Sequence, residues 1–135
     1  GADVTRVRKM FRTDLDAYKH KVEGVENAEL FMDNYAIGIL PAEGIDSPTV
    51  MAAQIANELL DVDGVKASFM LTKVKDTVYV SARSIDEVNV QVIMERLGGG
   101  GHASVAGAQL QDCTAEEAKQ KLEDLLKTMI AEGDI

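Results

Sequence analysis

Apolar residues recur at spacings of three and four in four segments of the chain, which is the period of an amphipathic helix. These segments are residues 4–22, 48–60, 85–97 and 115–129. The first segment carries basic side chains on its other face, and its pattern stops at Gly24. We therefore expect an N-terminal helix that either packs on the domain or links it to a preceding one.

Shorter stretches between these segments have the composition of strands. Residues 28–44 predict two strands joined by a turn at Asp33–Asn34 and closed by Pro41 and Gly44. Residues 65–84 predict a β-hairpin with its turn at residues 75–77, because β-branched and aromatic residues are frequent on both sides of it. Residues 107–110 predict one more short strand. Helices and strands interleaved in this way predict an α/β fold with a mixed β-sheet flanked by helices.

Three short motifs mark where helices begin. Ser47–Pro48 combines a side-chain oxygen for the N-cap with a proline at the first helical position. Ser84 and Glu87, like Thr114 and Glu117, have the spacing of a capping box, in which each side chain bonds to the other residue's backbone N–H. We therefore expect helices to begin directly after Ser47, Ser84 and Thr114.

The composition indicates one domain and narrows the choice of ligands. The chain has 135 residues, of which 46% are hydrophobic and 27% are charged, as in an ordinary globular domain. No apolar run is long enough to span a bilayer, and the single Cys113 forms no internal disulfide. The net charge is −9, with +3 in residues 1–21, −8 in residues 22–110 and −4 in residues 111–135. This charge disfavours long nucleic acids, because binding them needs clustered cations, and an anionic ligand must be met by a few placed groups.

Residues that suit a phosphate gather at the end of the predicted hairpin and in the loop after the next helix. An arginine side chain can form a bidentate pair with a phosphate, and consecutive glycines let backbone N–H groups approach an anion. We expect the strand end and the loop to meet at one edge of the sheet, where ligands commonly bind in α/β folds. The candidate substrate-binding residues are Ser81, Arg83, Ser84, Gly98, Gly99, Gly100, Gly101, His102 and Ser104.

A plainer interpretation of the glycines stays open, in which they only cap a helix and form a flexible turn. It is weakened because one or two glycines suffice for a cap, and each further one costs roughly 0.5–1 kcal/mol where order is required. Catalytic groups are scarce: the sequence has two histidines and no His-x-x-His, Cys-x-x-Cys or Walker-type motif. The Asp61-x-Asp63 spacing is more typical of a solvated turn than of a metal site. We therefore predict no catalytic residue and no bound metal in this chain.

The segment SARSIDEVNVQVIMERLGGGGHASVAGAQL, residues 81–110, resembles the motif region of the DHHA1 domain, the C-terminal companion of the DHH-type phosphoesterase domain. The family pattern is a Ser-x-Arg-Ser strand end, a helix, Gly-Gly-Gly-His and a small Ala-Gly step. These parts fall here at Ser81–Ser84, Gly99–His102 and Ala106–Gly107. The run VNVQVIMERLGGGGH is most similar to the membrane-anchored bacterial cyclic-di-AMP phosphodiesterases. The basic helix with AELFMDNYAIGILP is similar to the segment that joins the DHH core to DHHA1 in those proteins.

The resemblance implies that residues 1–24 are a linker helix from a DHH domain and that residues 25–135 are a DHHA1 substrate-binding domain. It implies a manganese-dependent phosphodiesterase of bacterial second-messenger signalling, which hydrolyses cyclic-di-AMP to linear pApA with Mn²⁺ held in the DHH domain. His102 and the glycine backbone would hold a phosphate, while Arg83, Ser81 and Ser84 would contact phosphate or nucleobase. The chain alone is expected to be inactive and to bind no cofactor. The whole protein would be anchored to the membrane with this domain in the cytoplasm, and homodimerisation is a further option.

Two other assignments stay open. A DHHA1 module of an oligoribonuclease, a pAp phosphatase or a RecJ-like exonuclease would share these motifs. The acidic middle block disfavours the exonuclease, because a processive enzyme needs a cationic channel. A non-catalytic nucleotide-binding accessory domain, such as the DHHA1-like tail of a synthetase, would lack catalytic residues as well.

Overall fold

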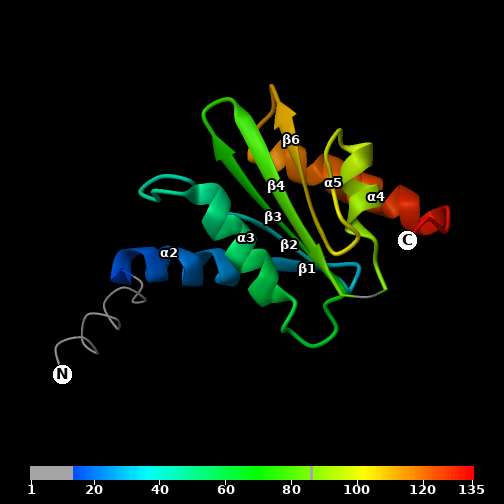
Figure 1. The fold of residues 1–135 in the computed structure, drawn as a ribbon, viewed down its shortest axis with the longest axis horizontal. Coiled ribbons are helices and arrows are strands. Elements are labelled where there is room, and N and C mark those ends of the chain that lie inside the picture. Colours follow the sequence, from blue (N-terminus) through cyan, green and yellow to red (C-terminus); the bar gives the residue numbers. More distant parts are fainter. Residues whose placement is uncertain (1–13, 86) are drawn as a thin grey trace.

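A mixed β-sheet with helices on both faces forms the centre of the molecule (Figure 1), as the sequence predicted. The computed structural model describes residues 14–85 and 87–135. In chain order the elements are α2 (Leu15–Glu26), β1 (Glu29–Phe31), β2 (Tyr35–Ile39), α3 (Pro48–Leu59), β3 (Ala67–Val74), β4 (Thr77–Ser84), α4 (Val90–Arg96), β5 (Gly100–Gly101), β6 (Val105–Gln111) and α5 (Ala115–Ala131). The strand order is β1-β2-β3-β4-β6-β5. Among the strands of the described residues, β2 and β3 pair in parallel, with α3 as their connection, and the other neighbouring pairs are antiparallel.

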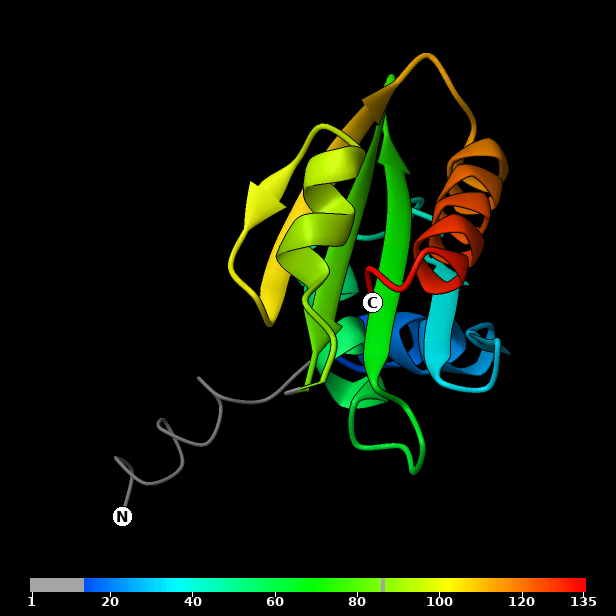
Figure 2. The same ribbon diagram turned by 90° about the vertical axis from the view of Figure 1, so that its right-hand side faces the viewer.

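The two faces of the sheet are covered by different helices. On one face, Phe69 and Leu71 pack with Ile93 of α4 and Leu122 of α5 in one buried cluster. On the other face, Met70 packs with α3 in a second cluster. Figure 2 shows α4 and α5 on the same side of the sheet. Because β3 is buried on both faces, its sequence is mostly apolar rather than alternating, and its buried Ser68 and Thr72 hydroxyls donate to backbone carbonyl oxygens.

The strand β6 has one open face. Its residues alternate between exposed and buried, with Val105, Gln109 and Gln111 exposed and Ala106, Ala108 and Leu110 buried. The buried set faces α4 and α5, since it belongs to the cluster on that side. The exposed set therefore faces the α3 side of the sheet, beyond the strands that α3 covers. This open face holds the candidate site.

Two expectations about local structure are wrong, for physical reasons. Gly24 does not end the first helix, which continues to Glu26; instead Gly24 is buried, and a Cβ there would lie 2.6 Å from the Ile55 side chain. The helix expected after Ser84 begins only at Val90. It is capped by Asn89, whose side chain accepts hydrogen bonds from the N–H groups of Gln91 and Val92. Ser84 is the last residue of β4, so the geometry of an N-cap is not available to it.

Other local expectations are confirmed. The turn expected at Asp33–Asn34 lies at residues 32–34, where Met32 and Asp33 have positive φ angles. Thr114 and Glu117 form a complete capping box at the start of α5. Ser47 is the N-cap residue of α3 as expected, although its side chain makes no capping hydrogen bond. The part of the predicted first helix that precedes Asp14 lies outside the described residues.

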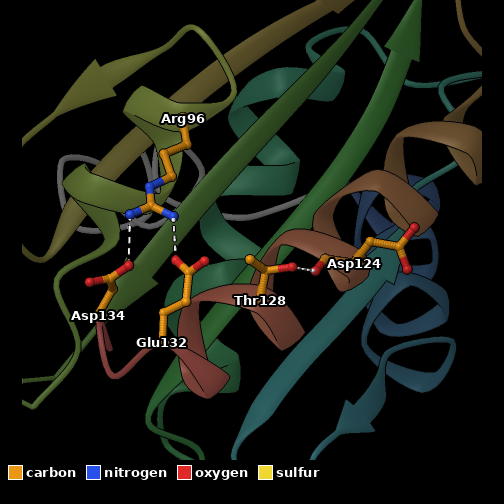
Figure 3. A network of polar contacts seen from close by, with 5 residues as sticks. All are labelled: Arg96, Asp124, Thr128, Glu132 and Asp134. Carbon is orange, nitrogen blue, oxygen red and sulfur yellow. Dashed lines mark hydrogen bonds and ion pairs between the residues drawn. The ribbon is translucent and has the colours of Figure 1, made fainter.

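Arg96 connects the end of α4 to the end of the chain. Its guanidinium group lies 2.8 Å from the Asp134 carboxylate and 3.8 Å from that of Glu132 (Figure 3). Both acidic residues follow α5 directly, so the two helices that cover one face of the sheet are joined beside the glycine run. Within the described part of the chain, no helix is both long and apolar enough to cross a membrane.

Candidate functional site

One face of β4 carries the first group of predicted site residues. Side chains alternate along a strand, and Val78, Val80 and Ala82 point into the core beneath α4 and α5. Tyr79, Ser81 and Arg83 therefore share the opposite, partly exposed face. Ser81 and Arg83 were singled out from the sequence. Tyr79 was not, although the same period of two places it on their face.

Next to Ser81 the sheet has almost no side chains on this face. Ser81 pairs with Gly107 on β6, and Gly107 pairs in turn with Gly100 on β5. We call Ser81, Gly107 and Gly100 the glycine row. Tyr79 and Gln109 form the pair on one side of this row, and Arg83 and Val105 form the pair on the other side.

A groove of about 570 Å³ lies over the glycine row. It is lined by backbone and side-chain atoms of the row itself, by Tyr79 and Gln109, and by Thr49 near the start of α3. Among residues 14–85 and 87–135, the ones that line it are all uncharged. The groove is open to solvent and contains four of the predicted site residues, Ser81, Gly98, Gly99 and Gly100.

The glycine run does not meet the end of β4 as the sequence predicted, because β6 lies between β4 and β5 and Gly100 is level with Ser81 rather than with the strand end. Its first two glycines end α4. The Gly98 N–H donates to the carbonyl oxygen of Glu95 (3.0 Å), and the Gly99 N–H donates to that of Met94 (2.8 Å). With a positive φ at Gly98, this is the Schellman motif of a helix end. These two N–H groups are therefore occupied and do not face an anion.

Close contact with β6 explains why positions 99 and 101 must be glycine. A Cβ at Gly99 would overlap the Gly107 carbonyl oxygen and lie 2.7 Å from the Ala108 Cα. A Cβ at Gly101, which has a φ of 139°, would lie 2.6 Å from the Ala106 Cα. Gly100 is different, because a Cβ there would meet nothing within 4 Å. The plain structural interpretation thus explains three of the four glycines and leaves Gly100.

The N–H of Gly101 is the glycine donor best placed for a ligand. The His102 N–H donates to the Val105 carbonyl oxygen (2.7 Å), so residues 102 and 105 form a hydrogen-bonded pair. Such pairs alternate along an antiparallel ladder, and the next one is Gly100 with Gly107. By this alternation the Gly101 N–H is directed away from β6, at the outer edge of the sheet.

His102 and Ser104 lie in the short turn between β5 and β6, and both are exposed. The turn is held against the end of β4, since the Ser84 N–H donates to the carbonyl oxygen of Ser104 (3.0 Å). The Ser84 side chain is buried, and its hydroxyl donates to the carbonyl oxygens of Val88 (2.6 Å) and Ala103 (3.2 Å). Ser84 therefore holds the turn in place rather than presenting a free hydroxyl.

Arg83 is partly buried beside this turn. Its Nη1 donates to the Ala82 carbonyl oxygen (2.8 Å), which fixes one side of the guanidinium group. Burial lowers the pKa of Arg83 from its ordinary value, because desolvation disfavours the charged form. An arginine remains protonated at neutral pH despite such a shift, so Arg83 supplies a cation at the end of β4.

Within residues 14–85 and 87–135 no three or more histidine, cysteine, aspartate or glutamate side chains come together as metal ligands. The described residues therefore do not fit a manganese centre, and we derive no metal-dependent step from them. Cys113 is a free, partly buried thiol.

Comparisons with known proteins agree with the motif. The sequence profile of the DHHA1 domain matches residues 33–132. The chain is 42% identical to "Cyclic-di-AMP phosphodiesterase PdeA" of Listeria monocytogenes over 90% of its own length, and 45% identical to "Cyclic-di-AMP phosphodiesterase GdpP" of Geobacillus thermodenitrificans over 93%. It spans only 19% of each of these relatives.

A solved structure shares the fold. An exopolyphosphatase-related protein from Bacteroides fragilis superposes with a TM-score of 0.76 at 19% identity, over 90% of this chain and 37% of that protein. At this identity the similarity speaks for the fold alone. Together with the profile match over residues 33–132, it leads to one assignment: the chain belongs to the DHHA1 domain family.

Proposed function

We propose that this chain is the substrate-binding domain of a manganese-dependent phosphodiesterase that hydrolyses cyclic-di-AMP to linear pApA. The observation that carries the proposal is the 42–45% identity to two proteins named cyclic-di-AMP phosphodiesterases, over at least 90% of this chain. Hydrolysis adds water across one of the two phosphodiester bonds and opens the ring. In this proposal the present chain holds the dinucleotide while the metals act from another domain.

The groups proposed to hold the phosphate surround the turn between β5 and β6. Arg83 offers two N–H groups in a fork, which matches two phosphate oxygens. His102 is exposed and can donate from its ring, and the Gly101 N–H adds a backbone donor at the sheet edge. Ser81 and Ser104 add hydroxyls on either side. Ser84 is left out of this set, because its hydroxyl is engaged by the fold.

The chemistry is proposed to reside in a DHH domain. Manganese would be bound there and would supply the activated water, whereas the described residues of this chain lack a matching ligand cluster. The 135-residue chain is therefore proposed to bind without cleaving. The whole protein is further proposed to be anchored to the bacterial membrane, with this domain on the cytoplasmic side, where a soluble second messenger is found.

Isothermal titration calorimetry on the 135-residue chain tests the proposal. We expect weak, selective binding of cyclic-di-AMP or pApA, and no cleavage of either when Mn²⁺ is added. Heat from a longer RNA, with none from either dinucleotide, would exclude the proposed substrate. Manganese-dependent turnover by this chain would show that the chemistry had been assigned to the wrong domain.

A further inference from the structure

We propose that Tyr79 and Gln109 form a nucleobase subsite that selects adenine, with the glycine row as its floor. In this subsite the Tyr79 ring stacks on the base and the Gln109 amide reads the edge of the base. The inference rests on the proposed function for the presence of a dinucleotide. It adds the residues that bind the base and the reason for the choice of base.

The two side chains are placed together by strand register. Tyr79 on β4 lies directly opposite Gln109 on β6. Side chains opposed in this way have Cβ atoms about 4.5–5.5 Å apart and share one face of the sheet. Both residues line the groove over the glycine row. A ligand in the groove therefore meets one aromatic ring and one amide group at the same wall.

The floor of the groove is clear enough to accept a flat ring. The glycine row crosses three neighbouring strands, which together span about 10 Å. Gly107 allows β6 to approach β4, because a Cβ there would lie 2.9 Å from the Val80 carbonyl oxygen. Gly100 has no such role, since a Cβ there would point into open space. A side chain at Gly100 would instead occupy the groove, so glycine at this position keeps the groove empty.

The electrostatics separate a base subsite from a phosphate subsite. The described residues that line the groove are all uncharged, so a neutral ring can contact them without leaving a charge unpaired. The cationic Arg83 is on the same face of β4, two residues beyond Ser81 and four beyond Tyr79, roughly 13 Å along the strand from Tyr79. A dinucleotide lying along β4 can therefore place one phosphate near Arg83 and one base near Tyr79.

The amide of Gln109 distinguishes adenine from guanine. A glutamine side chain can donate to N7 of adenine and accept from its N6 amino group. Guanine presents two acceptors, O6 and N7, on the same edge, so the amide oxygen of glutamine has no donor to meet there. Stacking on Tyr79 does not discriminate in this way, because every base has a π-face. Affinity is thus assigned mainly to Tyr79 and selectivity to Gln109.

Calorimetric titration of the 135-residue chain with cyclic-di-AMP and with cyclic-di-GMP tests the subsite. Tyr79→Ala is expected to weaken cyclic-di-AMP binding about 10-fold, as expected for the loss of one stacked base, whereas Tyr79→Phe keeps the affinity. Gln109→Ala is expected to remove most of the preference for cyclic-di-AMP over cyclic-di-GMP. Gly100→Val is expected to abolish binding without lowering the melting temperature, because its side chain points into the groove. Tyr18→Ala and Gln120→Ala, on helices away from the groove, serve as matched controls.

The outcomes separate this inference from the proposed function. If the wild-type chain binds cyclic-di-AMP and Tyr79→Ala, Gln109→Ala and Gly100→Val bind it equally well, the subsite is wrong and the proposed function stands. In that case the open face is only the solvated side of an antiparallel sheet. If the wild-type chain binds neither dinucleotide, both proposals are overturned.

Discussion

The Ser84 hydroxyl donates a hydrogen bond of 2.6 Å to the carbonyl oxygen of Val88, from a position with 6% of the residue exposed. A second, longer contact reaches the carbonyl oxygen of Ala103 at 3.2 Å. The same carbonyl accepts the N–H of Val90, the first residue of α4 (2.9 Å). One buried hydroxyl thus joins the end of β4, the start of α4 and the turn that carries His102.

Ser84→Ala is therefore expected to lower the free energy of unfolding by about 1 kcal/mol in the absence of any ligand, the usual net contribution of one hydrogen bond. Ser81→Ala is the matched control, because Ser81 lies on the same strand but faces the groove. Urea denaturation of both variants makes the comparison. If Ser84→Ala is as stable as the wild type but binds the dinucleotide more weakly, Ser84 contacts the ligand instead.

The glycine run gives a second contrast. Gly99→Ala is expected to destabilise the domain by about 1–3 kcal/mol, because the new methyl group meets the backbone of β6 and cannot be accommodated by a side-chain rotation. Gly100→Ala is expected to be neutral or slightly stabilising, since its methyl group enters open space. Thermal unfolding followed by circular dichroism measures both. A similar loss in the two variants would mean that the strand contact of Gly99 is not the cause.

The proposed phosphate contacts are tested by substitutions that spare the fold. Arg83→Lys and His102→Ala are each expected to weaken cyclic-di-AMP binding roughly 10-fold, because a lysine cannot form the two-bond fork and an alanine removes the ring donor. His102 is exposed, so the melting temperature of His102→Ala should equal that of the wild type. Arg96→Lys, at the ion pairs of Figure 3, is the matched arginine control and should bind normally. A drop in the melting temperature of His102→Ala would instead make the ring a structural group.

The capping box of α5 predicts a specific loss of stability in acid. Hydrogen bonds from the backbone and side chain of Thr114 lower the pKa of Glu117 below its ordinary value of 4.5. A carboxyl group whose pKa is lower in the folded state binds fewer protons there than in the unfolded state. Its contribution is therefore present above the unfolded pKa and is lost as the pH falls through the folded pKa. Glu117→Gln should flatten the dependence of unfolding free energy on pH below about 4.5. Urea denaturation at pH 7 and pH 3.5 measures this dependence. If it is unchanged in the variant, the Glu117 carboxyl group is not the cause of the loss of stability in acid.

Local signals in the sequence predicted the elements well where one physical requirement acted alone. The Thr114–Glu117 box is confirmed, because both residues lie exposed at a helix start where each side chain can bond to the other residue's backbone N–H. The same spacing at Ser84–Glu87 gave a wrong helix start, because β4 extends to Ser84 and the Ser84 hydroxyl is buried. Gly24 gave a wrong prediction for a similar reason. Its lack of a side chain makes room for Ile55 of the neighbouring helix α3 and does not mark a helix end. Such requirements come from tertiary contacts, which a local pattern does not contain.

The candidate site shows the same division. The sequence predicted that the end of β4 and the glycine run meet at one edge, whereas β6 lies between them, and it favoured an anion as the reason for all four glycines. In the structure, helix capping and close strand contact explain three of these glycines instead. The role proposed for Gln109 was not foreseen from the sequence, because it depends on facing Tyr79 on the neighbouring strand, and that register follows only from the fold.

The sheet ends in very short strands on both sides: β1 has three residues and β5 has two. Exposed strand edges are where folded chains add to one another and begin to aggregate. Each of these edge strands offers only a short template for such growth. Gly100 borders the groove and, with Gly101, forms an edge strand of two residues, which limits the pairing that a neighbouring molecule can add to β5. Concentrated samples for the titrations above should therefore stay free of fibrils.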